Sequence, residues 1–230
     1  MRANKYGNFL TIILILLIIG ILICSGILAY KHIIKPKVSK NKVEEAIAEF
    51  DRNVNKIEIQ PDENIEFEFP QENVNTEVNN VTSSTTQKGT LKSKTYYEGF
   101  VMIGYINIPK TNIKLPILNS SSDKAIEVAV ATIYPSNPKL NEPGNIVIIG
   151  HNYRDGRLFS NNKKLSVGDK ILITDTTGRQ LSYTIYQKFE TTPEDTSFYN
   201  RDTNGIPEIT LSTCTDDAKL RIIILARADQ

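Results

Sequence analysis

An uninterrupted apolar segment near the N-terminus limits what this chain can fold into. No residue from Phe9 to Tyr30 carries a charge, and most of them are Ile or Leu. A helix needs about 20 such residues to cross the hydrocarbon core of a bilayer. The segment therefore predicts a membrane-spanning helix over residues 9–30, preceded by a short tail of residues 1–8.

A cleaved signal peptide is the alternative interpretation of this segment. The apolar region of a signal peptide usually has only about 7 to 15 residues, so an uncleaved anchor fits the length better. Cys24 lies inside the segment and directly follows the bulky Ile23. We interpret Cys24 as a lipid-facing or packing residue.

The charges that flank the anchor bear on its orientation. Arg2 and Lys5 precede the apolar segment, and five lysines follow it: Lys31, Lys35, Lys37, Lys40 and Lys42. The positive-inside rule taken alone places the C-terminal part in the cytoplasm. Long domains can be translocated regardless of charge, so we base the expected location on the chemistry of the C-terminal part.

Residues 31–94 differ in composition from the rest of the chain and predict a linker. Eleven Asp or Glu and only two basic residues lie between Val43 and Asn80, where asparagines are also frequent. The tract Thr82–Gly89 offers nothing apolar to bury. A helix of about two turns is expected near Val43–Phe50, where apolar residues follow the helical repeat. We expect the carboxylates to repel one another and keep the linker extended.

Residues 95–230 form a domain large enough for one hydrophobic core, and short strands dominate it. Seven runs rich in Ile, Val, Tyr and Thr are separated by Pro, Gly, Asn and Asp: Phe100–Ile108, Ile113–Leu118, Gly144–Ile149, Lys170–Thr174, Leu181–Phe189, Glu208–Thr213 and Arg221–Ala226. Asp123–Tyr134 is the best candidate for a helix. This pattern predicts a mostly antiparallel β-barrel or closed sandwich with one or two short helices.

Charge and residue counts exclude several functions. A formal net charge of +1 gives no basic surface for nucleic acid, so no nucleic-acid partner is expected. The whole chain has two cysteines and two histidines, too few for a disulfide scaffold or for a zinc site built from Cys and His.

One cysteine and one histidine stand out in the C-terminal domain. His151 follows the apolar run Gly144–Ile149, and Cys214 ends the run that begins at Glu208. A lone Cys is usually an inert buried residue and a lone His is usually a packing or surface residue. Here each one lies at the end of a predicted strand, where functional residues are frequently found.

Arg221 is the third candidate. If the last two predicted strands form an antiparallel hairpin, Cys214 and Arg221 face each other across a six-residue loop. Arginine is always charged and suits the binding of a carbonyl or oxyanion. An ion pair of Arg221 with Asp216 or Asp217 is the alternative. Arg227 lies six residues further along, too far from the sulfur at about 3.3 Å per residue.

These residues resemble the motifs of the sortases, the cysteine transpeptidases of Gram-positive cell surfaces. The family pattern is matched by Thr210–Cys214, which reads Thr-Leu-Ser-Thr-Cys, by Arg221 at the start of the next strand and by Gly150–His151 at a strand end. Gly104–Pro109 also resembles the first strand of the family. The match runs from about Gly99 to the C-terminus.

The resemblance implies a fold, a mechanism and partners. It implies a closed eight-stranded β-barrel in which Cys214 attacks a sorting signal of the Leu-Pro-x-Thr-Gly type between Thr and Gly, His151 transfers protons and Arg221 steadies the oxyanion. Ser212, Thr213 and Asn152 are expected to line the substrate site. The implied partners are surface proteins that carry the signal, a peptidoglycan-precursor amine as acceptor, and the membrane. The resemblance implies that neither a metal nor an organic cofactor is needed. The catalytic domain is then expected on the extracellular side of a single-pass anchor.

The class within the family and the type of function leave alternatives. No proline follows an aspartate, as it does in the lid of many pilus-building sortases, and no second apolar span follows the barrel. A class A or class D enzyme is therefore expected, with a pilus-polymerising enzyme as the alternative. A cysteine protease that releases the acyl group to water and a non-catalytic tethered surface module are the two rival functions.

Overall fold

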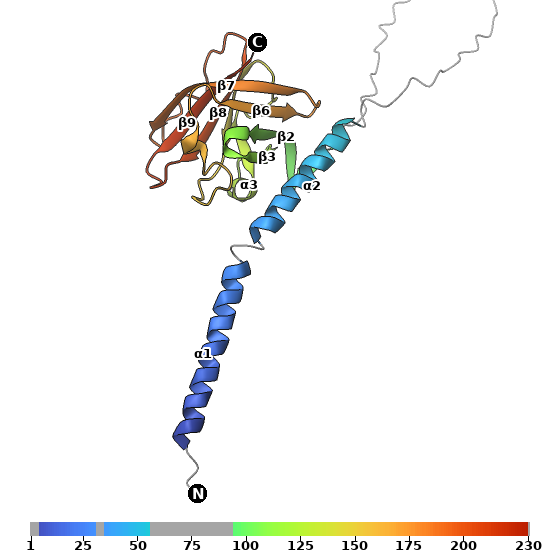
Figure 1. The fold of residues 1–230 in the computed structure, drawn as a ribbon. Coiled ribbons are helices and arrows are strands. Elements are labelled where there is room, and N and C mark those ends of the chain that lie inside the picture. Colours follow the sequence, from blue (N-terminus) through green and yellow to red (C-terminus); the bar gives the residue numbers. More distant parts are fainter. Residues whose placement is uncertain (1–4, 31–34, 56–93, 230) are drawn as a thin grey trace, which may run out of the picture. The chain divides into compact units, whose positions relative to one another are not determined.

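The computed structural model describes residues 5–30, 35–55 and 94–229 of the chain. Helix α1 spans Lys5–Ala29, and its segment Phe9–Ala29 has a mean hydropathy of 3.2, which makes it long and apolar enough to cross a membrane. Helix α2 spans Lys35–Asn55 and is longer than the two turns that the sequence predicts (Figure 1). The tract Thr82–Gly89 and most of the predicted linker lie outside the described residues.

The last turns of α2 and the C-terminal domain belong to one compact unit. This unit begins at Glu49 and extends to the C-terminus. The ring of Phe50 packs edge-on against Tyr105, with 5.9 Å between centroids. The side-chain amide of Asn53 donates a hydrogen bond to the hydroxyl of Thr95 (2.9 Å). The acidic segment between Asn53 and Thr95 therefore starts and ends at one place on this unit.

The C-terminal domain is a closed barrel, as the sequence predicts. Its strands are β1 (Thr95–Tyr97), β2 (Phe100–Ile108), β3 (Ile113–Leu118), β4 (Val130–Tyr134), β5 (Gly144–Ile149), β6 (Lys170–Asp175), β7 (Gln180–Thr191), β8 (Pro207–Cys214) and β9 (Arg221–Ala228). They pair in the order β1-β2-β3-β4-β5-β8-β9-β7-β6. Because β6 also pairs with β2, the eight strands β2 to β9 close on themselves, and β1 only extends the start of β2.

The helix in this domain is shorter than predicted, while the strand pairing is mostly antiparallel, as predicted. The segment Asp123–Tyr134 is not one helix: α3 spans Asp123–Val128, with the Ser122 side chain capping it, and β4 begins at Val130. The β-branched Val130, Thr132 and Ile133 favour a strand over a helix, which explains the early end of α3. Most pairs are antiparallel, but β3 pairs with β4 and β5 pairs with β8 in parallel.

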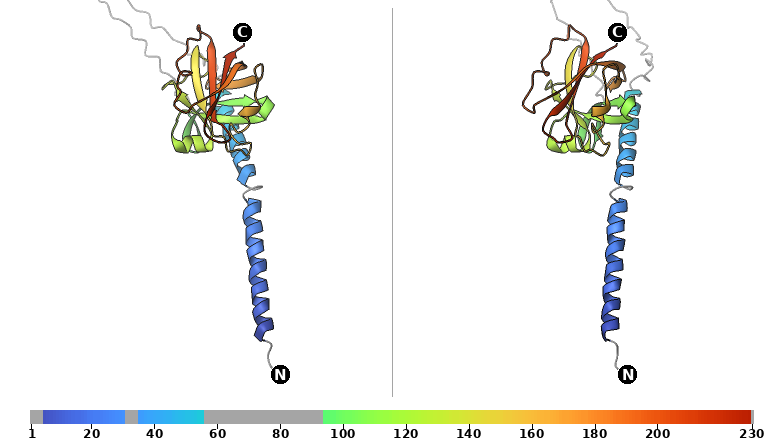
Figure 2. Two further views of the ribbon diagram at one scale, coloured as in Figure 1. Left: turned by 90° about the vertical axis from the view of Figure 1, so that its left-hand side faces the viewer. Right: turned by 60° about the vertical axis from the view of Figure 1, so that its left-hand side comes forward.

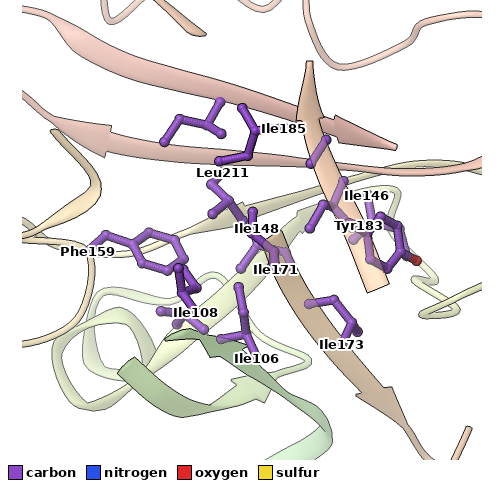
Figure 3. Close-up of a cluster of buried hydrophobic side chains, with 14 of the residues drawn as sticks. Ile106, Ile108, Ile146, Ile148, Phe159, Ile171, Ile173, Tyr183, Ile185 and Leu211 are labelled. Atoms are coloured by element: carbon purple, nitrogen blue, oxygen red, sulfur yellow. The ribbon is translucent and has the colours of Figure 1, made fainter. Parts of the chain in front are cut away.

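Alternate side chains of each strand fill the interior of the barrel. Figure 3 shows this core, in which Ile146 and Ile148 of β5 meet Leu211 of β8 and Ile185 of β7. A smaller apolar cluster lies on the opposite face of the same sheet and contains Val147, Phe198, Ile223 and Leu225. Strands β8 and β9, orange to red in Figure 2, run side by side, with β5 (yellow) next to β8. These three strands carry the candidate site.

Candidate active site

Two parallel neighbours, β5 and β8, bring His151 and Cys214 together. Ile149 pairs with Ser212 in this ladder, and the backbone N–H of Gly150 donates to the carbonyl of Ser212 (3.2 Å). Continuing this register sets His151 level with Cys214 at the ends of two strands that lie about 4.8 Å apart. Two residues that the sequence separates by more than 60 positions thus lie at neighbouring strand ends on one edge of the sheet.

Both side chains lie on the outside of the barrel. Ile148 and Leu211 belong to the interior core, and successive side chains of a strand point to opposite faces. His151 and Cys214 are three residues further along their strands, so they project from the outer face, where each is half-buried. The site is therefore accessible to a polypeptide substrate.

Thr213 lies on the opposite face from Cys214. Its side chain is buried, with 3% of its surface exposed, and its hydroxyl donates to the carbonyl of Gly150 (2.7 Å). The prediction that Thr213 lines the substrate site is therefore corrected: its side chain points into the barrel and links the two strand ends. Ser212 lies on the same outer face as Cys214, with 8% of its surface exposed.

Gly150 has no side chain, and this leaves space for buried core residues at the end of β5. A Cβ atom at this position would lie 2.8 Å from the ring of Phe159 and 2.9 Å from a methyl group of Val130. Both neighbours are completely buried, so neither can move away cheaply. The glycine before His151 is thus required by packing at the end of the strand.

Asn152 also connects the two strand ends. Its side-chain amide donates to the carbonyl of Cys214 (3.0 Å) and to the carboxylate of Asp216 (2.9 Å), and its amide oxygen accepts the N–H of Arg154 (3.0 Å). Through these bonds Asn152 links the end of β5 to the end of β8 and to the loop that follows it. Asp216 also binds Lys163, and this contact, followed by that with Asn152, holds the pKa of Asp216 below its usual value.

Arg221 lies directly opposite Cys214. The β8–β9 ladder pairs the two residues, which confirms the register predicted for the last hairpin. The loop between them is closed by the N–H of Thr215, which donates to the carbonyl of Leu220 (3.0 Å). Arg221 is half-buried on the outer face. Arg221 and Cys214 are therefore cross-strand neighbours on the same face of the sheet.

The structure does not fit an ion pair of Arg221 with the loop aspartates, nor Arg227 as the arginine beside Cys214. In the described part of the chain, Asp216 is paired with Lys163 and Asp217 contacts Thr215 and Lys219, so Arg221 forms no ion pair with either. Arg227 lies at the other end of β9, where its Nε donates to Glu208 (2.8 Å).

The chain segment that follows His151 packs against the imidazole. The centroid of the Tyr153 ring lies 5.2 Å from that of His151. The guanidinium of Arg157 lies over the Tyr153 ring, 4.4 Å from its centroid. The Tyr153 hydroxyl donates to the carbonyl of Glu127 (3.2 Å), and burial raises its pKa. Tyr153 therefore restricts one side of the histidine.

An apolar surface adjoins the three candidates on the outer face. Phe198, in the loop between β7 and β8, packs against Val147, Ile223 and Leu225, and Tyr199 lies at the edge of this cluster. Burial raises the pKa of Tyr199, while the charge of Arg221 opposes this shift, which puts Tyr199 within electrostatic range of the arginine. Phe198 and Tyr199 are not among the residues predicted for the site, although two adjacent aromatic residues in a polar loop are a detectable signal.

The arrangement suits acyl transfer. A thiol, an imidazole and a guanidinium at one edge of the sheet provide a nucleophile, a proton-transfer group and an oxyanion donor. Among the residues that the structure describes, no three His, Cys, Asp or Glu side chains gather closely enough to hold a metal ion.

The sequence is similar to proteins of one known family. A family model described as the sortase domain matches residues 106–229. The chain is 32% identical over 126 residues to a Sortase A of Bacillus anthracis and 28% identical over 153 residues to a Sortase A of Streptococcus agalactiae. The alignments cover 53% and 64% of this chain but only 58% and 61% of those proteins.

The fold is also similar to solved structures. Sortase A from Corynebacterium diphtheriae aligns with a TM-score of 0.52 and 28% identity, over 57% of this chain and 62% of that one. The pilus-related Sortase C of Group B Streptococcus aligns with a TM-score of 0.51 and 30% identity, over 56% and 68% of the two chains.

Proposed function

This chain belongs to the sortase family, and we propose that it is a membrane-anchored cysteine transpeptidase that cleaves a Leu-Pro-x-Thr-Gly-like sorting signal and transfers the acyl group to a cell-wall amine. The observation that carries the proposal is the alignment of His151, Cys214 and Arg221 on the outer face of β5, β8 and β9. An interior position would exclude a protein substrate, and the outer face admits one.

The proposed reaction has two stages. The Cys214 thiolate attacks the carbonyl carbon of the Thr in the signal, Arg221 stabilises the oxyanion, and the C–N bond to Gly breaks as the His151 imidazolium gives its proton to the departing amine. The acceptor amine then attacks the thioester and loses a proton to the neutral His151. The new amide bond forms as the sulfur leaves, and the enzyme returns to its starting state.

The anchor is proposed to be α1, with the catalytic domain on the extracellular side, where sorting signals and wall precursors meet. The length and hydropathy of Phe9–Ala29 support a single span. The lysines after the span oppose this orientation, and the proposed chemistry favours it.

The direct test uses the full-length protein in detergent with a fluorescent sorting peptide and an amine acceptor such as triglycine. The expected result is a ligated product with the acceptor joined to Thr, detected by mass spectrometry. Cys214→Ala should abolish both cleavage and ligation, whereas Cys24→Ala, which changes the other cysteine of the chain, should leave the rate unchanged. Cleavage that persists in Cys214→Ala would refute the assignment, and release of free acid without ligation would indicate a protease.

A pilus-polymerising activity is the second candidate because the similar structures include pilus-related Sortase C as well as Sortase A. The two functions differ in the acceptor. A single-protein anchoring enzyme should prefer the amine of a wall precursor, and a polymerising enzyme should prefer the side-chain amine of a pilin lysine. Competition between the two acceptors in one reaction decides between them.

A further inference from the structure

A polar cluster, in which three of five residues are buried, anchors the β7–β8 loop to the outer face of the barrel. We call it the Arg201 cluster; it consists of Arg201, Asn145, Tyr186, Glu208 and Thr210. The Arg201 guanidinium donates to the carboxylate of Glu208 (2.7 Å), to the amide oxygen of Asn145 (3.0 Å) and to the hydroxyls of Thr210 (3.3 Å) and Tyr186. Side-chain exposure is 19% for Arg201 and 1% for Glu208, so the ion pair is almost completely removed from water.

The cluster holds the backbone of the loop as well as its side chains. The Nε of Arg201 donates to the carbonyl of Phe198 (3.3 Å). The amide of Asn145 donates to the carbonyls of Phe198 (3.0 Å) and Tyr199 (2.8 Å). The two aromatic residues are thus fixed over β5 and β9, where they pack with Val147 and Ile223.

The cluster and the candidate site lie on one face. Asn145, Glu208 and Thr210 alternate with core residues, so they share the outer face with His151 and Cys214. The apolar surface formed with Phe198 lies between the polar cluster at one end of the strands and the reactive groups at the other.

We propose that Arg201 is a positioning residue: by anchoring the β7–β8 loop, it holds Phe198 and Tyr199 as the apolar wall against which the substrate peptide lies beside Cys214. The inference rests on the proposed acyl transfer, and it concerns how the β7–β8 loop is held in place. Arg201 acts through the loop and does not touch the substrate.

The test compares two arginines that bind the same buried carboxylate. Arg201→Met removes the bonds that hold the loop. Arg227→Met removes the other cation that binds Glu208, whose carboxylate lies 2.8 Å from the Arg227 Nε, and leaves the bonds to the loop in place. Arg201→Met should raise KM for the sorting peptide about tenfold or more and change kcat by less than about threefold, because the wall binds substrate without taking part in bond breaking. Arg227→Met should leave KM within about threefold of wild type.

A purely structural role predicts a different pattern. If both variants raise KM equally, or if Arg201→Met leaves KM unchanged, the proposal is wrong. The alkylation rate of Cys214 by iodoacetamide should be unchanged in both variants, since neither arginine contacts the thiol. An equal loss of alkylation and turnover in Arg201→Met would also overturn the proposal.

A second variant and a second measurement cover the case in which Arg201→Met does not fold. Arg201→Lys keeps a cation beside Glu208 but loses the fork of donors, so it should raise KM about threefold or more. Hydrogen exchange of the amides in residues 192–206 should accelerate in the Arg201 variants and not in Arg227→Met. The exchange measurement needs no substrate, so it tests the anchoring even if wild-type enzyme fails to transfer acyl groups.

Discussion

The hydroxyl of Thr213 offers a sharp test of how the candidate site is held together. It donates to the carbonyl of Gly150 (2.7 Å), and these two residues directly precede Cys214 and His151. Thr213→Val keeps the shape of the side chain and removes only this bond. The carbonyl of Gly150 then loses this donor. Because Thr213 is only 3% exposed, water has little access to replace the lost bond.

The structure sets the size of the expected effect. A buried polar group that loses its partner costs about 1 to 3 kcal/mol of unfolding free energy. A misplacement of about 1 Å between reacting groups can lower a rate about 100-fold. Two other links between the strand ends persist, from Gly150 to Ser212 and from Asn152 to Cys214. We therefore expect kcat/KM to fall by about tenfold, less than the full effect of misplacement.

Thr132→Val is the matched control. The Thr132 hydroxyl is also buried and donates to a backbone carbonyl, that of Leu118 (3.2 Å), but it lies in β4 and does not connect the two strand ends. Thermal unfolding should show a similar loss of stability in both variants. Acyl-transfer kinetics should show a loss of kcat/KM in Thr213→Val alone. If Thr213→Val transfers acyl groups as fast as Thr132→Val, the bond does not align the catalytic residues.

Three further predictions address the arginine, the pH response and the topology. Arg221→Lys should lower turnover by about 100- to 1,000-fold because lysine lacks the planar fork of donors, whereas Arg227→Lys should lower it less than about threefold. Acyl-transfer rates of the folded variants test this prediction. A larger loss in Arg227→Lys than in Arg221→Lys would refute the role proposed for Arg221. Lys170, Ser182 and Thr184 lower the pKa of Asp229 from 3.8 to about 2, so its contribution is present above 3.8 and lost as the pH falls through 2. Asp229→Asn should therefore cost about 1 kcal/mol at pH 7, discounted because the carboxylate is partly exposed, and nothing near pH 2; thermal unfolding at both pH values checks this, and an equal loss at both would contradict it. Protease added to intact cells should cut between Lys56 and Lys94 if the domain is extracellular, and protection until the membrane is broken would place it inside.

The strands and the last hairpin could be predicted because their signals are local. Apolar runs bounded by Pro, Gly, Asn and Asp placed seven strands, and the structure has each within a few residues of the predicted limits. The pairing of Cys214 with Arg221 followed from a short loop between two strands that are adjacent in the sequence. Both inferences need only the chain within about ten residues of the feature.

The errors arise where distant residues decide. The β-branched residues of Val130–Tyr134 favour a strand, but nothing within the segment identifies β3 and β5 as the strands that pair with it on its two sides. The Arg201 cluster joins residues of β5, β7, β8 and a loop, with 56 positions between Arg201 and Asn145. No periodicity in one segment reveals such a contact.

The orientation of the candidate site follows from the core rather than from the reactive residues. In β8, Ile209 and Leu211 are interior residues, and Thr213 continues their face. A shift of one residue would turn Cys214 into the barrel and expose the apolar residues, so the burial of Ile209 and Leu211 fixes the thiol outside. The same alternation in β5 and β9, set by Ile148 and Ile222, directs His151 and Arg221 outward. One apolar pattern in three neighbouring strands therefore aims all three side chains at a single surface.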